Sequence, residues 1–237
     1  MHLFDLKTKK SKTLFSSEQI VDFTWSKNSD KILHTKANKE ISAISIYSVK
    51  DNKSIDLVKD TIIDDPKIKE KTEKNYLISA TWSPDETKIA FIEHPLDTSR
   101  NKTVKVYDTK TQKVTSVSKP NQQAQAPLSW HSNGDSILYS GLTNYKAYYD
   151  EQLRDKVYEG ALHIYIGDLT GKVTQLTQGN HYHGRPIFSP DEKNIAFLFA
   201  EKLGDQRTYK LRSMDTNGKN IKKIYDYVYR ESFLTWK

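Results

Sequence analysis

An aromatic block that occurs four times along the chain constrains the fold more than any other feature of the sequence. Each copy starts with Trp or Phe, continues through a polar turn and ends in an apolar run that begins with Ile. The aromatic residues lie 57, 48 and 58 residues apart, and Trp236 starts a fifth copy 48 residues further on. This period fits one four-stranded repeat, such as a propeller blade. The four copies are Trp25–Leu33, Trp82–Phe91, Trp130–Tyr139 and Phe188–Phe197.

Each block predicts two strands joined by a tight turn. Ser-Pro-Asp and Ser-Asn-Gly favour turns, because Pro fixes φ, Asp and Asn bond the local backbone, and Gly accepts a positive φ. A second hairpin follows each block, for example after Val104–Asp108 and after His163–Gly167. The predicted strand order is therefore A-B-C-D four times, with an extra C-D pair over residues 2–15 and an extra A strand at Trp236. No comparable window has helical periodicity, so we expect an all-β chain.

The composition excludes several classes of protein. The 237 residues include no cysteine, which excludes disulfide scaffolds, thiolate metal sites and cysteine nucleophiles. The longest clean apolar run is Ile195–Ala200, whereas a membrane-spanning helix needs roughly 20 residues, so we expect no membrane span. Aromatic residues make up 11% of the chain and are well spread, which argues against disorder. We expect one domain over residues 1–237.

The net charge of +7 comes mainly from lysines scattered between the predicted strands. A nucleic-acid-binding protein usually concentrates its basic residues on one face or segment, and Arg rather than Lys provides the forked contacts to bases. We therefore interpret the charge as surface solvation and do not expect nucleic acid as a partner. No signal peptide follows Met1, so either the protein stays in the cytoplasm or an export segment is missing from the sequence.

The Trp-Ser-Pro-Asp block at Trp82, followed by the Val-Tyr-Asp strand that ends at Asp108 and a Thr-x-x-x-Lys turn, resembles the WD-like repeats of TolB-type β-propellers. Related blades occur in the N-terminal propellers of prolyl-oligopeptidase-family enzymes. The resemblance covers nearly the whole chain and implies four complete four-stranded antiparallel blades plus a split or incomplete one. The ring would then be either five-bladed, with both termini sharing one blade, or a truncated form of the six-bladed ring usual in the family.

The longer connections all belong to the B–C and D–A classes, which lie on one face of a propeller. Insertions gathered on one face usually mark the binding face. Tyrosines are abundant in and beside these segments, and Tyr combines a large contact area with a polar hydroxyl. The segments are Lys59–Tyr76, Glu93–Lys102, Lys119–Ala126, Gly141–Gly160 and Asp226–Ser232. The residues that we predict to bind a partner are Tyr145, Tyr148, Tyr149, His181, Tyr182, His183 and Arg185.

Histidines provide the only candidate metal site. In an extended segment His181 and His183 would point to the same side, and His94 is the candidate third ligand. Two loop histidines without fixed partners are more often polar surface, so we expect neither a metal nor another cofactor. Asp85 and Asp191 occupy the same place in the repeated turn, which favours a structural role over a catalytic one.

Two functional hypotheses remain open at this point. The first is a non-catalytic propeller scaffold that binds a protein partner through its long-loop face; the resemblance implies a place in the cell envelope. The second is a metal-dependent, lyase-like propeller, or the substrate-gating propeller of a prolyl-oligopeptidase-type hydrolase. No G-x-S-x-G or H-E-x-x-H motif is present, which favours the first hypothesis. The sequence predicts no particular oligomeric state.

Overall fold

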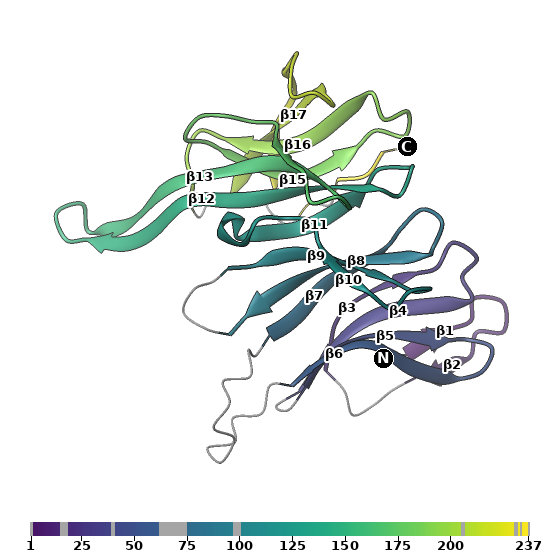
Figure 1. Ribbon diagram of the computed structural model, residues 1–237. Helices are drawn as coiled ribbons and strands as arrows, with labels where there is room; N and C mark the ends of the chain where they lie inside the picture. The colour runs from purple at the N-terminus through teal and green to yellow at the C-terminus, as the bar shows by residue number, and fades with distance from the viewer. Residues whose placement is uncertain are drawn as a thin grey trace.

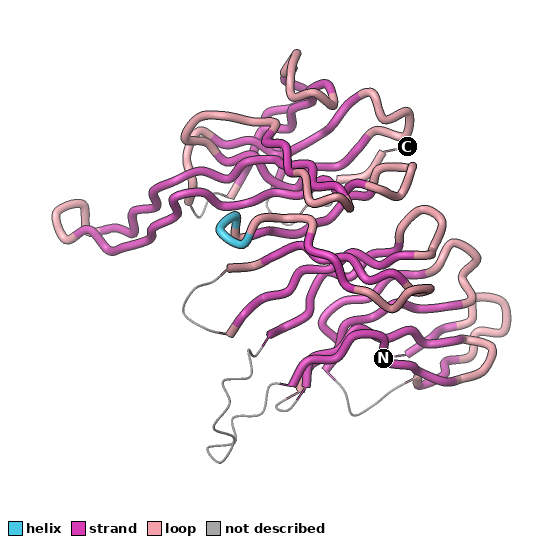
Figure 2. The backbone as a smooth tube through the Cα atoms, viewed as in Figure 1, coloured by secondary structure: helices cyan, strands magenta, loops and turns pink. Residues whose placement is uncertain are grey.

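The described part of the chain is built almost entirely from β-strands (Figures 1 and 2). The computed structural model describes residues 2–14, 19–38, 41–61, 75–96, 101–204, 207–229, 232 and 234–236. Within these ranges it has strands β1 to β18 and one 3-10 helix, η1 (Pro120–Gln122). The prediction of an all-β chain is therefore confirmed.

Four successive groups of four strands form antiparallel blades in which neighbours along the chain pair with each other. The first blade contains β3 (Gln19–Trp25), β4 (Lys31–Ala37), β5 (Ile41–Ser48) and β6 (Lys53–Thr61). The second contains β7 (Asn75–Trp82), β8 (Lys88–Pro95), β9 (Thr103–Asp108) and β10 (Val114–Ser116). The third contains β11 (Ala124–Trp130), β12 (Ser136–Asp150), β13 (Asp155–Asp168) and β14 (Val173–Gln175). The fourth contains β15 (Tyr182–Phe188), β16 (Asn194–Ala200), β17 (Thr208–Asp215) and β18 (Lys222–Tyr229).

The two ends of the chain do not share a blade in the described structure. Strands β1 (His2–Phe4) and β2 (Ser11–Thr13) pair only with each other and form a separate two-stranded sheet. The described residues near the C-terminus, 232 and 234–236, form no strand. Figure 1 places β1 and β2 beside the first blade, at the opposite end of the molecule from the fourth blade. The number of blades in a closed ring therefore stays a prediction.

Three of the four aromatic anchors pack between neighbouring blades. Trp82 packs against the apolar cluster that contains Leu33 and Ile44 of the first blade, and Phe188 belongs to the cluster that contains Leu138 and Ile164 of the third. Trp130 packs in the cluster between the second and third blades, and its indole N–H donates a hydrogen bond to the Thr81 carbonyl oxygen at 3.4 Å. The repeat period therefore reflects a repeated contact between blades.

Trp25 differs from the other anchors and is 39% exposed. It belongs to the first blade, and no four-stranded sheet of the described chain precedes that blade. Val21 and Phe23 on the same strand are also exposed. Trp25 therefore differs from the three anchors that pack between blades because it has no preceding four-stranded blade among the described residues to cover it.

The turns of the aromatic blocks confirm the structural role expected for Asp85 and Asp191. Asp85 accepts hydrogen bonds from the Ser83 hydroxyl at 2.7 Å and the Thr87 hydroxyl at 2.7 Å. These bonds favour the charged carboxylate and hold its pKa well below the usual value. Asp191 accepts from the Ser189 hydroxyl at 2.6 Å in the same way.

The next residue in both Ser-Pro-Asp-Glu turns connects neighbouring blades. Glu86 accepts a hydrogen bond from the backbone N–H of Lys27, in the turn of the first blade. Glu192 accepts from the backbone N–H of Ser132, in the turn of the third blade, and from the Ser132 hydroxyl at 2.6 Å. The carboxylates therefore fasten each turn to the preceding blade at the surface, while the aromatic anchors do so inside.

The Gly141–Gly160 segment is not the expected loop. Strands β12 and β13 continue through it and form a hairpin that projects well beyond its blade (Figure 1). Pairing runs from Ser136–Asp168 out to Asp150–Asp155, with a bulge between Thr143 and Lys146. The outer part of this hairpin, residues 144–159, is called the ribbon below. The segment forms strands instead of a loop because its two arms can form cross-strand pairs with each other. The prediction of a loop considered only the length of the segment.

The other long segments are partly visible. Lys59–Tyr76 and Glu93–Lys102 lie partly outside the described residues. Lys119–Ala126 contains η1 and the start of β11, and β18 extends through the beginning of Asp226–Ser232.

Removal of a buried anchor should destabilise the protein far more than removal of the exposed one. Phe188 is 9% exposed and Trp25 is 39% exposed, although they occupy the same position in the repeat. We expect Phe188→Ala to lower the free energy of unfolding by about 3 to 5 kcal/mol, whereas Trp25→Ala should cost about 1 kcal/mol or less. Urea denaturation followed by tryptophan fluorescence and circular dichroism measures both. Equal costs would contradict the role assigned to contact between blades.

Candidate functional site

The inner strand of every blade carries a bulge at the same place in the repeat. The register between the first and second strands shifts between Ile20 and Asp22, Ile78 and Thr81, Gln125 and Ser129, and Gly184 and Ile187. Three residues before the aromatic anchors stand Asp22, Ser79, Pro127 and Arg185. A bulge turns side chains away from the regular alternation, and bulges often border functional sites.

These bulges line a common cavity of about 360 Å³ at the axis of the blades. Its walls come from all four inner strands and from Leu234 near the C-terminus. Asp22 accepts hydrogen bonds from the Thr35 hydroxyl at 2.5 Å and from the Ser79 backbone N–H at 2.5 Å, and so connects the first two blades. Arg185 donates to the Ser232 carbonyl oxygen at 3.0 Å. The axial cavity thus has one acidic and one basic wall, each bonded to the protein itself.

Three histidines gather where the third and fourth blades meet. The rings of His181 and His183 lie 5.9 Å apart, which confirms that they share a side. His163 on β13 is the third member, with its ring 6.0 Å from that of His183 and nearly parallel to it. His163 was not among the residues predicted from the sequence, because its partners come from another blade. The three residues are called the histidine cluster below.

Backbone carbonyl groups fix the tautomers of two of these histidines. The Nδ1 atom of His181 lies 2.9 Å from the Glu201 carbonyl oxygen, and that of His183 lies 3.2 Å from the Leu162 carbonyl oxygen. Because a carbonyl oxygen only accepts, both Nδ1 atoms carry the proton. The bond from His183 also fastens β15 to β13, next to the Leu162–Tyr182 pair that joins these strands in parallel.

Burial favours the neutral form of two members of the histidine cluster, His163 and His183. Burial lowers the pKa of His183 to about 4, and the neighbouring His163 and His181 and the Arg212 guanidinium act in the same direction. Burial also lowers the pKa of His163. The guanidinium carbon of Arg212 lies 3.3 Å from the centre of the Phe199 ring, so a permanent positive charge stands close to the cluster.

The candidate metal ligands do not form a three-residue site. His94 lies on β8 in the second blade, opposite Tyr76, and not in the histidine cluster. In the part of the chain that the structure describes, no three His, Asp or Glu residues are grouped so that they could hold a metal ion. Among the described residues, His181 and His183 therefore have no third ligand of the kind on which the metal hypothesis depends.

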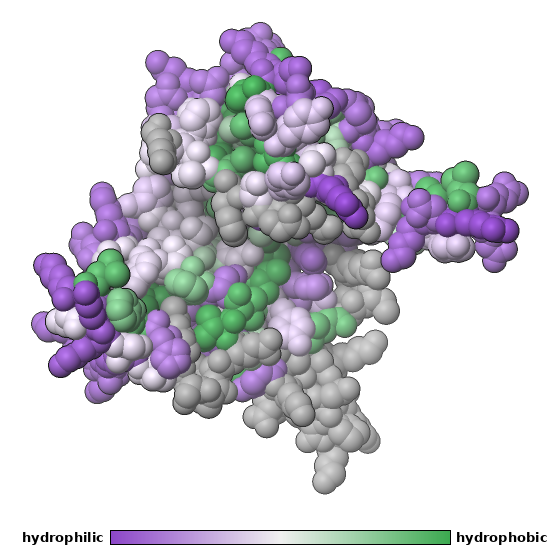
Figure 3. Space-filling model, turned by 180° about the vertical axis from the view of Figure 1, so that it is seen from behind, coloured by the Kyte–Doolittle hydropathy of each residue, from purple (hydrophilic) through white to green (hydrophobic). Residues whose placement is uncertain are grey.

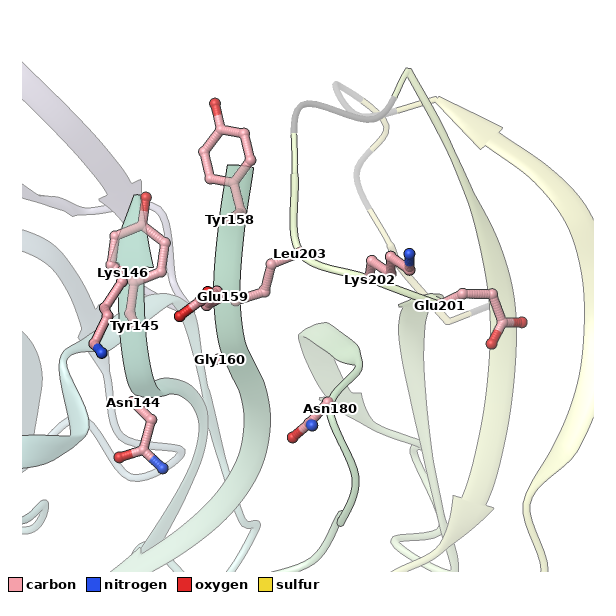
Figure 4. Close-up of a pocket in the computed structure, with 10 residues that line it drawn as sticks. All are labelled: Asn144, Tyr145, Lys146, Tyr158, Glu159, Gly160, Asn180, Glu201, Lys202 and Leu203. Atoms are coloured by element: carbon pink, nitrogen blue, oxygen red, sulfur yellow. The ribbon is translucent and has the colours of Figure 1, made fainter. Parts of the chain in front are cut away.

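A groove of about 810 Å³ lies between the ribbon and the fourth blade (Figure 4). The Tyr145 and Tyr158 side chains stand on the ribbon wall and point the same way, and Leu203 extends toward the ribbon from the opposite wall. Gly160 has φ +100°, and a Cβ there would lie 2.5 Å from the Thr143 carbonyl oxygen, so glycine is required where the ribbon leaves the blade. The lining residues are Asn144, Tyr145, Lys146, Tyr158, Glu159, Gly160, Asn180, Glu201, Lys202 and Leu203.

Tyr148 and Tyr149 lie on opposite faces of the ribbon, because successive side chains of a strand alternate. Tyr149 shares its face with Tyr158, the cross-strand partner of Ala147, whereas Tyr148 shares the other face with Val157. The Tyr148 hydroxyl donates a hydrogen bond to Glu159 at 3.0 Å. The two side chains are 45% and 61% exposed, respectively. Figure 3 shows apolar atoms on the hairpin among hydrophilic ones.

Six of the seven residues predicted to bind a partner are distributed over three sites. The ribbon and groove hold Tyr145, Tyr148 and Tyr149, the histidine cluster holds His181 and His183, and Arg185 lies at the axial cavity. Tyr182 packs on Tyr209 with ring centres 4.7 Å apart. Asp22, His163 and Tyr158 are among the site residues that were not predicted from the sequence. Asp22 had a signal in the sequence, namely its position three residues before an anchor, and Tyr158 had another, because it is one of the tyrosines of the Gly141–Gly160 segment.

Comparison with known proteins agrees with this architecture. The model of the family described as "Eukaryotic translation initiation factor eIF2A" matches residues 12–160. The Tol-Pal system protein TolB of Francisella tularensis is 29% identical over 100 residues, which are 42% of this chain and 19% of TolB. This chain thus spans about a fifth of the length of the curated relatives that it matches.

Solved structures show the same fold over most of the chain. TolB from Acinetobacter baumannii has a TM-score of 0.60 at 19% identity, covering 95% of this chain and 48% of that one. An oligogalacturonate lyase from Vibrio parahaemolyticus has a TM-score of 0.65 at 12% identity, covering 96% of this chain and 59% of that one. At these identities the comparison supports the fold only.

The fold and its repeated blades define a TolB-like β-propeller. The WD-like repeats account for that similarity, since their turns and anchors build each blade and its contact with the previous one. Within this class, the chain belongs to the family described as eukaryotic translation initiation factor eIF2A.

Acid should destabilise the protein through His183. Its pKa is about 4 in the folded chain and about 6.5 in an unfolded one, so the unfolded chain binds the proton first as the pH falls. The contribution of neutral His183 to the free energy of unfolding is therefore fully present above pH 6.5. It decreases as the pH falls to about 4, by up to about 3 kcal/mol. His183→Gln should remove most of this loss, whereas His2→Gln, at an exposed histidine, should leave it unchanged. Urea denaturation at pH 7.5, 6, 5 and 4.5 measures the free energy of unfolding at each pH. If this free energy fell with pH as steeply in His183→Gln as in the wild type, the assignment to His183 would be contradicted.

Proposed function

We propose that this protein is a non-catalytic propeller scaffold that binds a protein partner through the face formed by the ribbon and the groove. One observation carries the proposal: a hairpin projects from an otherwise regular blade and presents exposed tyrosines beside an 810 Å³ groove. Regular blades need no such extension for their own packing, and long extensions of a rigid scaffold are common places for binding residues.

The chemistry of the groove suits a polypeptide. Asn144 and Asn180 each offer an amide donor and acceptor, which match the backbone groups of a partner. Tyr145 and Tyr158 provide aromatic area with a polar end, a combination that is enriched at protein interfaces. The volume lies within the usual range of about 300 to 1,000 Å³ for binding pockets. In this proposal the predicted residues Tyr148 and Tyr149 extend the contact along the two faces of the ribbon.

The location proposed for the protein follows the likeness to TolB. The curated relatives are named as proteins of the Tol-Pal system, and on that likeness we place this chain in the cell envelope. Among the described residues, no helix has the length and hydropathy required to cross a membrane. The family description names a translation factor; the match supplies the fold, and the scattered lysines give no reason to transfer a nucleic-acid-binding role.

The enzymatic hypothesis has less support. One structural relative is an oligogalacturonate lyase in complex with manganese, with a TM-score of 0.62. The histidine cluster is the feature that favours this alternative, but His94 lies elsewhere and the described residues form no three-ligand metal group. The gating hypothesis is supported only by the shared fold. The matched prolyl endopeptidase is much longer, and this chain covers 30% of it. We therefore retain the scaffold as the proposed function.

Loss of the exposed ribbon tyrosines should weaken partner capture without affecting the fold. We expect the double variant Tyr148→Ala/Tyr149→Ala to reduce capture about tenfold or more, because central aromatic residues dominate interface energies. The two single variants then show which face of the ribbon contributes more. Capture is measured by quantitative mass spectrometry after pull-down from envelope extracts with the immobilised protein.

The matched control is Tyr225→Ala/Tyr227→Ala, which removes a more exposed tyrosine pair, 57% and 71% exposed, from β18 in the fourth blade. This control should leave capture unchanged. The proposal fails if both double variants retain the wild-type set of captured proteins, or if both lose it equally while their unfolding midpoints stay the same.

A further inference from the structure

The ribbon has two strand edges, and among the described strands neither edge is paired on its outer side. Strand β12 pairs with β11 only as far as Gly141, and β13 pairs with β15 only at Leu162. Beyond these points the described strand pairing of each arm of the ribbon is with the other arm. Unpaired strand edges tend to recruit another strand, and an isolated two-stranded ribbon is marginally stable in water.

The two edges differ in what lies next to them. The β13 edge borders the groove, and a Cβ added at Gly204 would lie 3.7 Å from the Tyr158 ring, so the segment after Ala200 approaches this edge closely. Figure 4 shows Leu203 extending toward the same arm. The β12 edge lies on the other side of the ribbon, and Figure 1 shows the ribbon projecting clear of the blades. The open edge is therefore that of β12.

We propose that the β12 edge of the ribbon pairs with the same edge of a second copy of this chain. The two copies would be related by a two-fold axis through Tyr148, perpendicular to the ribbon. Their two arms of β12 then run antiparallel, and the two ribbons join into one four-stranded sheet.

The sequence of this edge is complementary to itself in that register. Lys146 of one copy lies opposite Asp150 of the second copy, and the pair occurs twice because of the symmetry. Ala147 lies opposite Tyr149 of the second copy, so a small side chain lies next to a large one. This pair is on the face of the sheet opposite to that of Tyr148. Tyr148 faces its own counterpart at the axis. Opposite charges and aromatic pairs directly across a sheet are stabilising.

The β13 edge lacks this complementarity. A two-fold axis through Val157, the residue opposite Tyr148, would place Asp155 against Glu159 of the second copy twice. Like charges directly opposite each other destabilise a sheet. The charge pattern and the accessibility of the two edges therefore both favour β12 as the edge that pairs with a second copy.

The paired state goes beyond the function proposed above, because it concerns the strand edge and leaves the groove of each copy open. It would place two grooves in a fixed relation on one assembly. The contact is short compared with a permanent dimer interface, so we expect reversible pairing that depends on protein concentration.

Cysteine cross-linking tests the register directly, since the chain has no cysteine of its own. Directly opposite residues of antiparallel strands have Cα atoms about 4.5 to 5.5 Å apart, within the range of a disulfide. Under mild oxidation, purified Tyr148→Cys should form a covalent dimer at least tenfold faster than Tyr149→Cys or Val157→Cys. In the proposed register, neither control residue lies opposite its own counterpart. Equal or slower cross-linking of Tyr148→Cys would overturn the proposed pairing.

A charge exchange provides a second test without cysteine. Lys146→Glu/Glu159→Lys keeps an opposite-charge pair within the ribbon but places the introduced carboxylate against Asp150 of the second copy. Sedimentation velocity of the purified protein should show a concentration-dependent dimer for the wild type and at least tenfold weaker dimerisation for the variant. A wild type that stays monomeric at 200 μM, or equal dimerisation of both proteins, would overturn the inference. Because no other protein is present, either result is independent of partner capture.

Discussion

Contact between successive blades is the interaction on which the rest of the structure depends. An aromatic anchor on the inner strand of one blade enters the apolar face of the blade before it, as Trp82, Trp130 and Phe188 do. The adjacent Glu86 and Glu192 add hydrogen bonds to the preceding turn at the surface. The exposure of Trp25, in a blade with no four-stranded sheet before it among the described residues, shows that the anchor is buried by its neighbour and not by its own blade. Each blade is thus stable only as part of a series.

The candidate sites arise where this regular series is interrupted. The bulges of the inner strands form the axial cavity, with Asp22 and Arg185 on its walls. The junction of β13 with β15 brings His163 to His183, and β12 and β13 continue past their blade as the ribbon. Binding residues on such features can vary without loss of the core, because the anchors and turns that hold the blades together lie elsewhere. This separation explains why propellers with similar blades support different functions.

Much of the fold could be predicted from the sequence, whereas the site could be predicted only in part. The paired orientation of His181 and His183 follows from strand alternation within one segment and was predictable. The separation of His94 from them was not, because it depends on which blade each residue belongs to. Tyr148 and Tyr149 were predictable as exposed residues. Their opposite faces became evident only when the segment proved to be a strand, since in a loop neighbouring side chains have no fixed alternation.

By itself the sequence determined the blade, its strand order and its turns, because these depend on local patterns: apolar alternation, Pro and Asp in the turns, and an aromatic residue at a fixed place. Only the tertiary structure decided that Gly141–Gly160 is a paired ribbon, that His163 joins the other histidines, and that Asp22 bonds to Ser79 of the next blade. These features require residues that lie far apart in the chain to meet, and the twist and packing of whole blades determine which ones do.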